Sequence, residues 1–198
     1  QYVNLIKGNL TRSYSIANSS NHNNQLEFFI KKYQNGLMSK YLFEEAKIND
    51  LLRLEGPLGS FFLRESNYEH IIFLATGTGI APIKSIIESV MDQPANFNKK
   101  KFWIFVGARY EEDLLWNPII SNDQIQVIYV PVLSRQVNNW NGEKGYVQEV
   151  VLKQNINLEN AQAYACGSNE MIQEAKKLLI KNSLKENTFF SDVFVPTN

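Results

Sequence analysis

The sequence predicts a fold in two parts, a partial antiparallel β-barrel followed by an α/β domain built on a parallel sheet. From about Tyr68 onward, apolar runs of strand length alternate with helix-like segments, an order typical of parallel strands joined by crossover helices. Before that point, short apolar runs are separated by turns rich in Asn, Ser and Gly, such as residues 18–21, which favour antiparallel strands. The polar segment 64–67 lies between the two patterns, so we expect domains at residues 1–66 and 67–198.

Each element is predicted from its local pattern along the chain. In the first domain we expect strands at 2–6, 13–17, 26–33 and 51–55 and a short helix at 38–46. In the second we expect strands at 71–75, 102–107, 125–130 and 162–166, and helices near 80–92, 112–120, 145–153 and 169–182. Residues 71–75 have the β-branched, apolar content of a buried strand. The helix after them places Ile83, Ile86, Ile87 and Val90 on one face.

Composition excludes several classes of protein. Of 198 residues, 44% are hydrophobic, enough for a sizeable core. Twenty basic residues balance twenty acidic ones, so no overall charge points to nucleic acid or an anionic membrane. No apolar run approaches the roughly 20 residues of a membrane helix, and Gln1 opens no signal-peptide pattern, so we expect the cytoplasm. The single cysteine rules out an internal disulfide or a four-cysteine iron–sulfur site within this chain.

The strongest local motif lies between the run 71–75 and the helix that follows it. Thr76-Gly77-Thr78-Gly79-Ile80-Ala81-Pro82 forms a glycine-rich turn in which Gly77 and Gly79 allow close approach of a ligand to the backbone. Pro82 suits a first helical turn, where its missing N–H costs nothing. The exposed N–H groups at the helix start favour phosphate oxygens. The motif is therefore either a pyrophosphate-binding loop or a plain strand-to-helix turn without a ligand.

A second candidate site lies in the first domain. Along a strand, Arg12 and Tyr14 share one face while Ser13 and Ser15 share the other. A guanidinium and a phenol on one face suit a cofactor with phosphate and a flat ring, although an ordinary cross-strand pair has the same pattern. Gly36-Leu37-Met38-Ser39 precedes the short helix and is either a second phosphate-binding turn or a plain helix N-cap by Ser39.

A third candidate site begins at the only cysteine. Cys166 ends the expected strand 162–166, Gly167 permits a sharp turn, and Ser168 or Asn169 caps the next helix. The carboxyl ends of parallel strands are where ligands bind in open α/β sheets, although a buried cysteine also serves as a small hydrophobic residue. His22 and His70 fall in expected loops and show no metal-ligand spacing, and we identify no Ser-His-Asp set.

These motifs together resemble the ferredoxin–NADP reductase superfamily over nearly the whole chain. The ordered motifs are Arg12-x-Tyr14-Ser15, Gly36-x-x-Ser39, Gly56-Pro57-Leu58-Gly59, Gly77-Thr78-Gly79-Ile80-Ala81-Pro82, Cys166-Gly167-Ser168 and the aromatic stretch 189–196. Each is weak alone, but their order is highly specific. The end of the chain most resembles the CDP-6-deoxy-Δ3,4-glucoseen reductases, with the reductase components of ring-hydroxylating oxygenases as close relatives.

The resemblance implies a flavin site in the first domain. Arg12 would contact the FAD pyrophosphate, Tyr14 would stack on the isoalloxazine ring, and Ser15 would hydrogen-bond near N5. Gly36 and Ser39 would hold the FAD phosphates.

The resemblance also implies a nicotinamide site in the second domain. Residues 76–82 would bind the NAD(P)H pyrophosphate. Cys166, followed by Gly167, would lie beside the nicotinamide C4 and flavin N5 and orient hydride transfer without acting as a nucleophile. Phe194 would cover the opposite face of the flavin. The chemistry would belong to the cofactors and the positioning to the protein.

Two departures from the family bear on partners. Family members have further barrel strands before the position of Gln1, so we expect residues 1–66 to supply only part of a barrel and the chain to be a fragment of a longer polypeptide. In the resembled branches a 2Fe–2S domain with four cysteines also precedes the flavin domain. An iron–sulfur centre is therefore expected only in a missing segment or in a partner protein that accepts the electrons.

The choice between NADH and NADPH depends on residues after the second and third parallel strands. Arg109 stands where an acidic residue would suit NADH, while Ser134 and Arg135 could hold a 2′-phosphate. The acids at 111–113 and the resembled branches favour NADH. Two alternatives to the iron–sulfur-linked reductase stay open, a free-flavin reductase and a nucleotide-binding module without redox activity. A module without redox activity has no need of both a flavin-facing tyrosine and a thiol.

Overall fold

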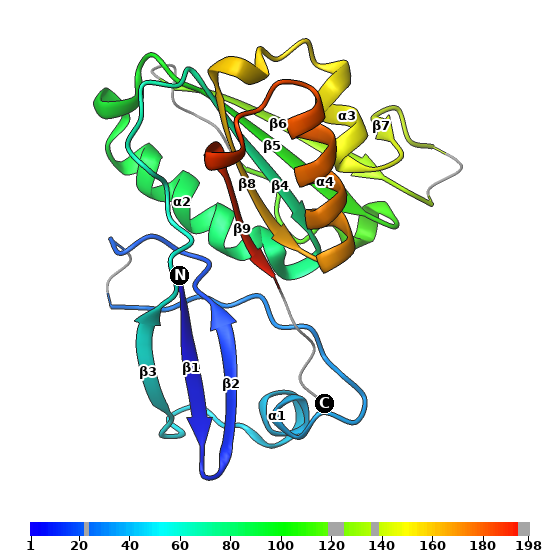
Figure 1. Ribbon diagram of the computed structural model, residues 1–198. Helices are drawn as coiled ribbons and strands as arrows, with labels where there is room; N and C mark the ends of the chain where they lie inside the picture. The colour runs from blue at the N-terminus through cyan, green and yellow to red at the C-terminus, as the bar shows by residue number, and fades with distance from the viewer. Residues whose placement is uncertain (22–23, 119–124, 136–138, 194–198) are drawn as a thin grey trace.

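The computed structural model describes residues 1–21, 24–118, 125–135 and 139–193. It contains a small antiparallel sheet and a larger parallel sheet, with helix α2 on the side of the large sheet that faces the small one (Figure 1). Both parts of the expected fold class are therefore confirmed. Among the described residues, no helix is long and apolar enough to cross a membrane.

The small sheet has the strand order β2-β1-β3, with β1 paired antiparallel to both neighbours. The strands are β1 (Tyr2–Lys7), β2 (Leu10–Ser15) and β3 (Arg53–Leu58). The expected helix at 38–46 is formed by α1 (Leu37–Lys40) and a π-helical turn, η1 (Tyr41–Glu45). Leu5, Met38 and Tyr41 form a small core beneath this sheet, against which Tyr14 packs.

Two predictions for the first domain need correction. The strand expected at 13–17 begins earlier and ends at Ser15, because a turn at Gly8 starts the β1–β2 hairpin. The strand expected at 26–33 is wrong, since only an isolated bridge joins Ile16 to Phe28. The N–H of Glu27 is bound instead by the side chain of Asn18 (2.7 Å), so loop contacts replace a strand ladder there.

The large sheet is parallel throughout, with the order β7-β6-β5-β4-β8-β9. Its strands are β4 (His70–Thr76), β5 (Lys101–Ala108), β6 (Gln126–Leu133), β7 (Glu143–Lys144), β8 (Ala161–Gly167) and β9 (Phe189–Val193). The α-helices are α2 (Ile80–Asp92), α3 (Val147–Lys153) and α4 (Asn169–Lys181). Single 3₁₀ turns are η2 (Gly77–Gly79), η3 (Pro94–Phe97), η4 (Glu111–Asp113), η5 (Leu158–Asn160) and η6 (Glu186–Thr188).

Apolar layers cover both faces of this sheet. The apolar side chains of α2 pack with those on one face of β4, β5 and β8, while those of α3 and α4 pack on the other face. Ile83, Ile87 and Val90 are at most 1% exposed and Ile86 is 9% exposed, as the helical spacing predicts. Because both faces are covered, β4 and β8 are buried along almost their whole length.

Two predictions for the second domain are also wrong. The helix expected at 112–120 is only the turn η4 in the described residues up to 118, because Asp113 folds back to accept the N–H of Tyr110. Its last two residues lie outside the described part. His70 is not in a loop but opens β4, where it pairs with Lys101 and Ala161. His22 lies outside the described residues.

The linker between the sheets is tied to the centre of the large one. The hydroxyl of Tyr164, on β8, accepts a hydrogen bond from the N–H of Arg64 (2.9 Å). Phe61 meets the ring of Tyr164 edge-on, with 5.9 Å between centroids, and lies in the same apolar cluster as α2. These contacts fix the end of the first domain against the face of the sheet that α2 covers.

Candidate cofactor-binding site

The glycine-rich loop lies at the carboxyl end of β4, as the sequence predicts. Thr76 ends the strand, η2 turns the chain, and α2 begins at Ile80 with Pro82 in its first turn. No side chain accepts a hydrogen bond from the N–H groups at the start of η2 or of α2. The hydroxyl of Thr76 instead accepts the N–H of Ser168 (3.1 Å), which joins this loop to the end of β8.

The two glycines of the loop have different environments. Gly77 has a φ of +54°, and a Cβ there would meet no atom within 4 Å. A Cβ at Gly79 would overlap the backbone carbonyl of Cys166, so this glycine lets the start of α2 pack directly on β8. Open space beside Gly77 and uncapped N–H groups fit a pyrophosphate.

Cys166 and Gly167 lie beside this loop. In the sheet, Cys166 on β8 lies opposite Ala75 of β4 on one side and opposite Asp192 of β9 on the other. Gly167 has a φ of +146°, and a Cβ there would overlap the hydroxyl oxygen of Thr76. Ser168 caps α4, accepting the N–H of Met171 (3.3 Å).

The thiol itself is buried among apolar side chains of the α2 layer. Burial, together with the nearby carboxylate of Asp192, raises the pKa of Cys166 well above its usual range, so the thiol is protonated at neutral pH. A protonated, buried thiol agrees with a residue that is not a nucleophile. It agrees equally with a packed hydrophobic residue, so its place beside a nicotinamide stays a prediction.

Strand β2 carries the expected flavin-facing residues. Arg12 and Tyr14 share one face, and the alternate face carries Ser15, which is 7% exposed. Tyr14 is half-buried, with its ring 6.2 Å from that of Phe28. Burial raises the pKa of Tyr14, and the charge of Arg12 opposes part of that rise.

The Gly36–Ser39 turn lies next to this strand. Gly36 is the residue before α1 and provides no side-chain cap, so the alternative of a helix capped by Ser39 is wrong. The hydroxyl of Ser39 is buried and accepts the N–H of Tyr33 (3.0 Å), which closes the turn. The pocket beside Gly36 is lined by Lys32, Lys40 and Glu44. Lys32 pairs with Glu44 (2.9 Å) and Lys40 with Glu45 (3.4 Å), so phosphate binding at this turn stays a prediction.

The end of β2 meets the end of β8 through Gln1. The carbonyl of Gln1 accepts the N–H of Ile16 (3.1 Å), directly after Ser15. The amine of Gln1 donates to the carbonyl of Phe61 (3.0 Å), and Phe61 lies in the same apolar cluster as Cys166. The structure therefore brings the expected flavin strand and the expected nicotinamide residue to the same place.

Arg109, Ser134 and Arg135 form a separate exposed group at the carboxyl ends of β5 and β6. The N–H of Arg135 donates to the carbonyl of Arg109 (3.0 Å), and that of Ser134 to Ala108 (3.0 Å). Two guanidinium-bearing residues are thus side by side, an arrangement suited to a phosphate.

The comparison with the sequence leaves one predicted residue that the structure does not describe and two contact residues that the sequence did not indicate. Phe194 lies outside the described residues. The sequence reasoning missed Tyr164, which holds the linker, and Lys84, which joins the domains. The i, i+4 spacing of Lys84 and Glu88 was the available signal. No group of three potential metal ligands occurs in the part of the chain that the structure describes.

The two sheets and the open glycine-rich loop fit a protein with a flavin-binding part and a dinucleotide-binding part. A family model described as the oxidoreductase FAD-binding domain matches residues 1–63, and one described as the oxidoreductase NAD-binding domain matches residues 73–177. The chain therefore belongs to the FAD- and NAD-binding oxidoreductases and has the ferredoxin reductase fold.

Curated relatives resemble the chain along its whole length. It is 40% identical over 198 residues to the CDP-6-deoxy-L-threo-D-glycero-4-hexulose-3-dehydrase reductase of Yersinia pestis, covering 100% of this chain and 59% of that protein. It is 31% identical to the anthranilate 1,2-dioxygenase electron transfer component of Acinetobacter baylyi, covering 94% and 54%. The chain thus spans little more than half the length of these relatives.

Solved structures share the fold. The ferredoxin reductase in carbazole 1,9a-dioxygenase superposes with a TM-score of 0.83 at 24% identity, over 98% of this chain and 60% of that one. A ferredoxin NADP⁺ reductase from Neisseria gonorrhoeae with bound FAD and NADP gives 0.80 at 22% identity, over 98% and 85%.

Proposed function

We propose that this chain is the FAD- and NADH-binding part of a reductase that passes electrons from NADH through FAD to an iron–sulfur centre. One observation carries the proposal: the residues just after β2 are hydrogen-bonded to Gln1 and to Lys84 of α2, and Gln1 is bonded to Phe61, which lies in the same apolar cluster as Cys166. A flavin bound along β2 and a nicotinamide bound beside Cys166 would lie next to each other.

The chain's own residues would bind and orient the cofactors. FAD, when bound, supplies the chemistry, because it accepts a hydride and releases electrons singly. Arg12 would hold its pyrophosphate and Tyr14 would cover its ring, with Gly36 and Ser39 at the phosphates. The protonated thiol of Cys166 would help position the nicotinamide.

The dinucleotide would lie along the carboxyl edge of the large sheet. The N–H groups after Thr76 would bind its pyrophosphate, with Gly167 leaving room at the neighbouring turn. Arg109, Ser134 and Arg135 would border the adenosine end. We propose NADH as donor, because the carboxylates at 111–113 adjoin that end, and the two arginines make NADPH the alternative.

The electron acceptor is proposed to be an iron–sulfur domain or protein that serves a CDP-6-deoxyhexulose dehydrase. The 40% identity to the Yersinia pestis reductase supports this choice. The resemblance to the anthranilate dioxygenase component supports a ring-hydroxylating oxygenase as the alternative partner. The division into domains at residues 66 and 67 and the cytoplasmic location also stay predictions.

The experiment is an anaerobic stopped-flow measurement with excess FAD. The loss of flavin absorbance is followed after mixing with NADH or NADPH, and the visible spectrum of the separated protein reports retained flavin. Reduction of protein-bound FAD, faster with NADH, is the expected result. Reduction of free FAD alone would identify a free-flavin reductase, and no reduction with either nucleotide would leave only a binding module.

A further inference from the structure

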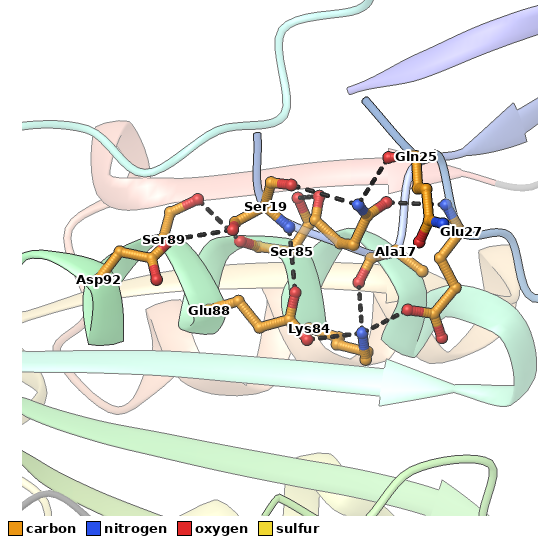
Figure 2. Close-up of polar contacts among 10 residues, drawn as sticks. Ala17, Ser19, Gln25, Glu27, Lys84, Ser85, Glu88, Ser89 and Asp92 are labelled. Carbon is orange, nitrogen blue, oxygen red and sulfur yellow. Dashed lines mark hydrogen bonds and ion pairs between the residues drawn. The ribbon is translucent and has the colours of Figure 1, made fainter. Parts of the chain in front are cut away.

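A network of hydrogen bonds and ion pairs joins the first domain to helix α2 (Figure 2). We call it the interdomain clamp. Its members are Ala17, Asn18, Ser19 and Glu27 from the first domain and Lys84, Ser85, Glu88 and Asp92 from α2. Polar networks of this density are costly to bury unless their groups are paired.

Lys84 is the central residue of the interdomain clamp. Its Nζ donates to the carbonyl of Ala17 (3.1 Å), to Glu27 Oε2 (2.7 Å) and to Glu88 Oε1 (2.6 Å). An ammonium has three N–H groups, so each has an acceptor. The residue is only 8% exposed. Burial lowers the pKa of Lys84, but hydrogen bonds to the two carboxylates outweigh that effect and raise it, which keeps the charge.

A second set of contacts repeats the connection along α2. Glu88 Oε2 accepts the N–H of Ser19 (3.0 Å), and Asp92 accepts the hydroxyl of Ser19 (2.9 Å). The hydroxyl of Ser85 donates to the carbonyl of Asn18 (2.8 Å). Three successive turns of the helix therefore hold residues 17–19 of the first domain.

The clamp lies between the two cofactor-binding segments. Ala17 follows Ser15, at the end of the flavin strand, by two residues. Lys84 is the fifth residue of α2, about 6 Å along the axis from the helix start at the glycine-rich loop. Any shift of α2 against residues 17–19 would therefore move the dinucleotide loop relative to the flavin strand.

We infer that Lys84 is a positioning residue, which holds α2 against residues 17–19 and thereby fixes the distance between nicotinamide and flavin. The inference rests on the proposed function. Rates of transfer between two bound groups fall steeply with misplacement, by as much as about 100-fold for about 1 Å. A residue that only stabilised the fold would not change the rate in the molecules that remain folded.

The test compares Lys84→Met with Lys176→Met. Methionine keeps an unbranched apolar stem and removes the three donors of Lys84. Lys176 pairs with Glu186 (3.0 Å) within the second domain, so its variant controls for loss of a lysine ion pair without loss of an interdomain contact. Amide hydrogen exchange of the full chain is measured without cofactors, and flavin reduction is measured by stopped flow over a range of NADH concentrations.

Lys84→Met is expected to speed exchange at residues 17–19 at least tenfold and leave Ile86 and Ile87 unchanged. The maximal reduction rate should fall at least tenfold, with the NADH concentration for half-maximal rate and the bound FAD within about twofold of the parent. Lys176→Met should change none of these. Glu27→Gln keeps the oxygen acceptor and removes the charge, so it should also speed exchange at residues 17–19 and lower the maximal rate, by smaller factors than Lys84→Met. It replaces Lys84→Met in the test if that variant does not fold.

Unchanged exchange at 17–19, an unchanged maximal rate, or an equal effect of Lys176→Met would overturn the inference. So would a defect that disappears at high NADH, because that would be a defect of binding. Failure of the parent chain to reduce bound FAD would refute the proposed function instead, and exchange would still decide whether Lys84 holds the two domains together.

Discussion

Replacement of the two glycines of the glycine-rich loop by alanine separates packing from the proposed ligand binding. At Gly79 a Cβ would overlap backbone atoms of Cys166 and Gly167, which cannot rotate away. Overpacking of this kind costs up to ~3 kcal/mol. The φ of Gly79 is −60°, so alanine adds no backbone strain there.

At Gly77 the cost has another origin. A Cβ meets nothing within 4 Å, but the φ of +54° costs an alanine roughly 1 to 2 kcal/mol. In both variants the alanine also lowers the conformational entropy of the unfolded chain, which stabilises the folded protein by about 0.4 to 1 kcal/mol. The expected net losses are therefore about 2 kcal/mol for Gly79→Ala and about 0 to 1.6 kcal/mol for Gly77→Ala.

Thermal unfolding and ligand titration test this pair. A loss of 1 kcal/mol lowers Tm by about 2 to 4 °C in a chain of this size, so Gly79→Ala should melt about 4 to 8 °C below the parent and Gly77→Ala within a few degrees of it. Calorimetric titration with ADP-ribose should show weaker binding by Gly77→Ala, because its methyl group occupies the open space of the loop. Equal melting temperatures, or undiminished binding by Gly77→Ala, would refute the assignment of these roles.

Three further predictions concern the cofactors. Tyr14→Ala should weaken FAD binding about fivefold, since loss of ring stacking costs about 1 kcal/mol beyond buried area, and equal occupancy in equilibrium dialysis would remove Tyr14 from the site. Cys166→Ala should slow flavin reduction in stopped flow with FAD content unchanged. Because its pKa is raised by burial, native Cys166 should also resist iodoacetamide at pH 8 to 9 while the unfolded chain reacts, and fast native labelling would contradict this. Arg135→Ala should reduce the rate with NADPH more than that with NADH, and equal losses would place Arg135 away from the 2′ position.

Local patterns accounted for the four central strands of the parallel sheet, β6, β5, β4 and β8. The run 71–75 and the stripe from Ile83 to Val90 carry their own periodicity, so β4 and α2 could be predicted without knowledge of what they pack against. The glycine-rich loop follows from the same reasoning, because a strand, a turn and a helix start are all encoded within about 15 residues. The order of the motifs then indicated the family.

Segments whose structure depends on distant partners were predicted poorly. Residues 26–33 are rich enough in apolar side chains for a strand, but Asn18 and Lys84 bind Glu27 and hold it in a loop. Strand β9 was not anticipated, since its place beside β8 depends on a chain reversal after α4. A short segment has no pattern that reports such contacts.

The sequence by itself determined the class of fold, the position of the glycine-rich loop and the strand that carries Arg12 and Tyr14, because each depends on spacing between near neighbours. Only the tertiary structure decided that Arg109 lies beside Arg135, that Cys166 is sealed among apolar side chains, and that Lys84 joins the two domains. Burial and pairing are properties of surfaces brought together from far apart in the chain. They depend on contacts between segments that are distant in the sequence, so no short stretch of residues can predict them.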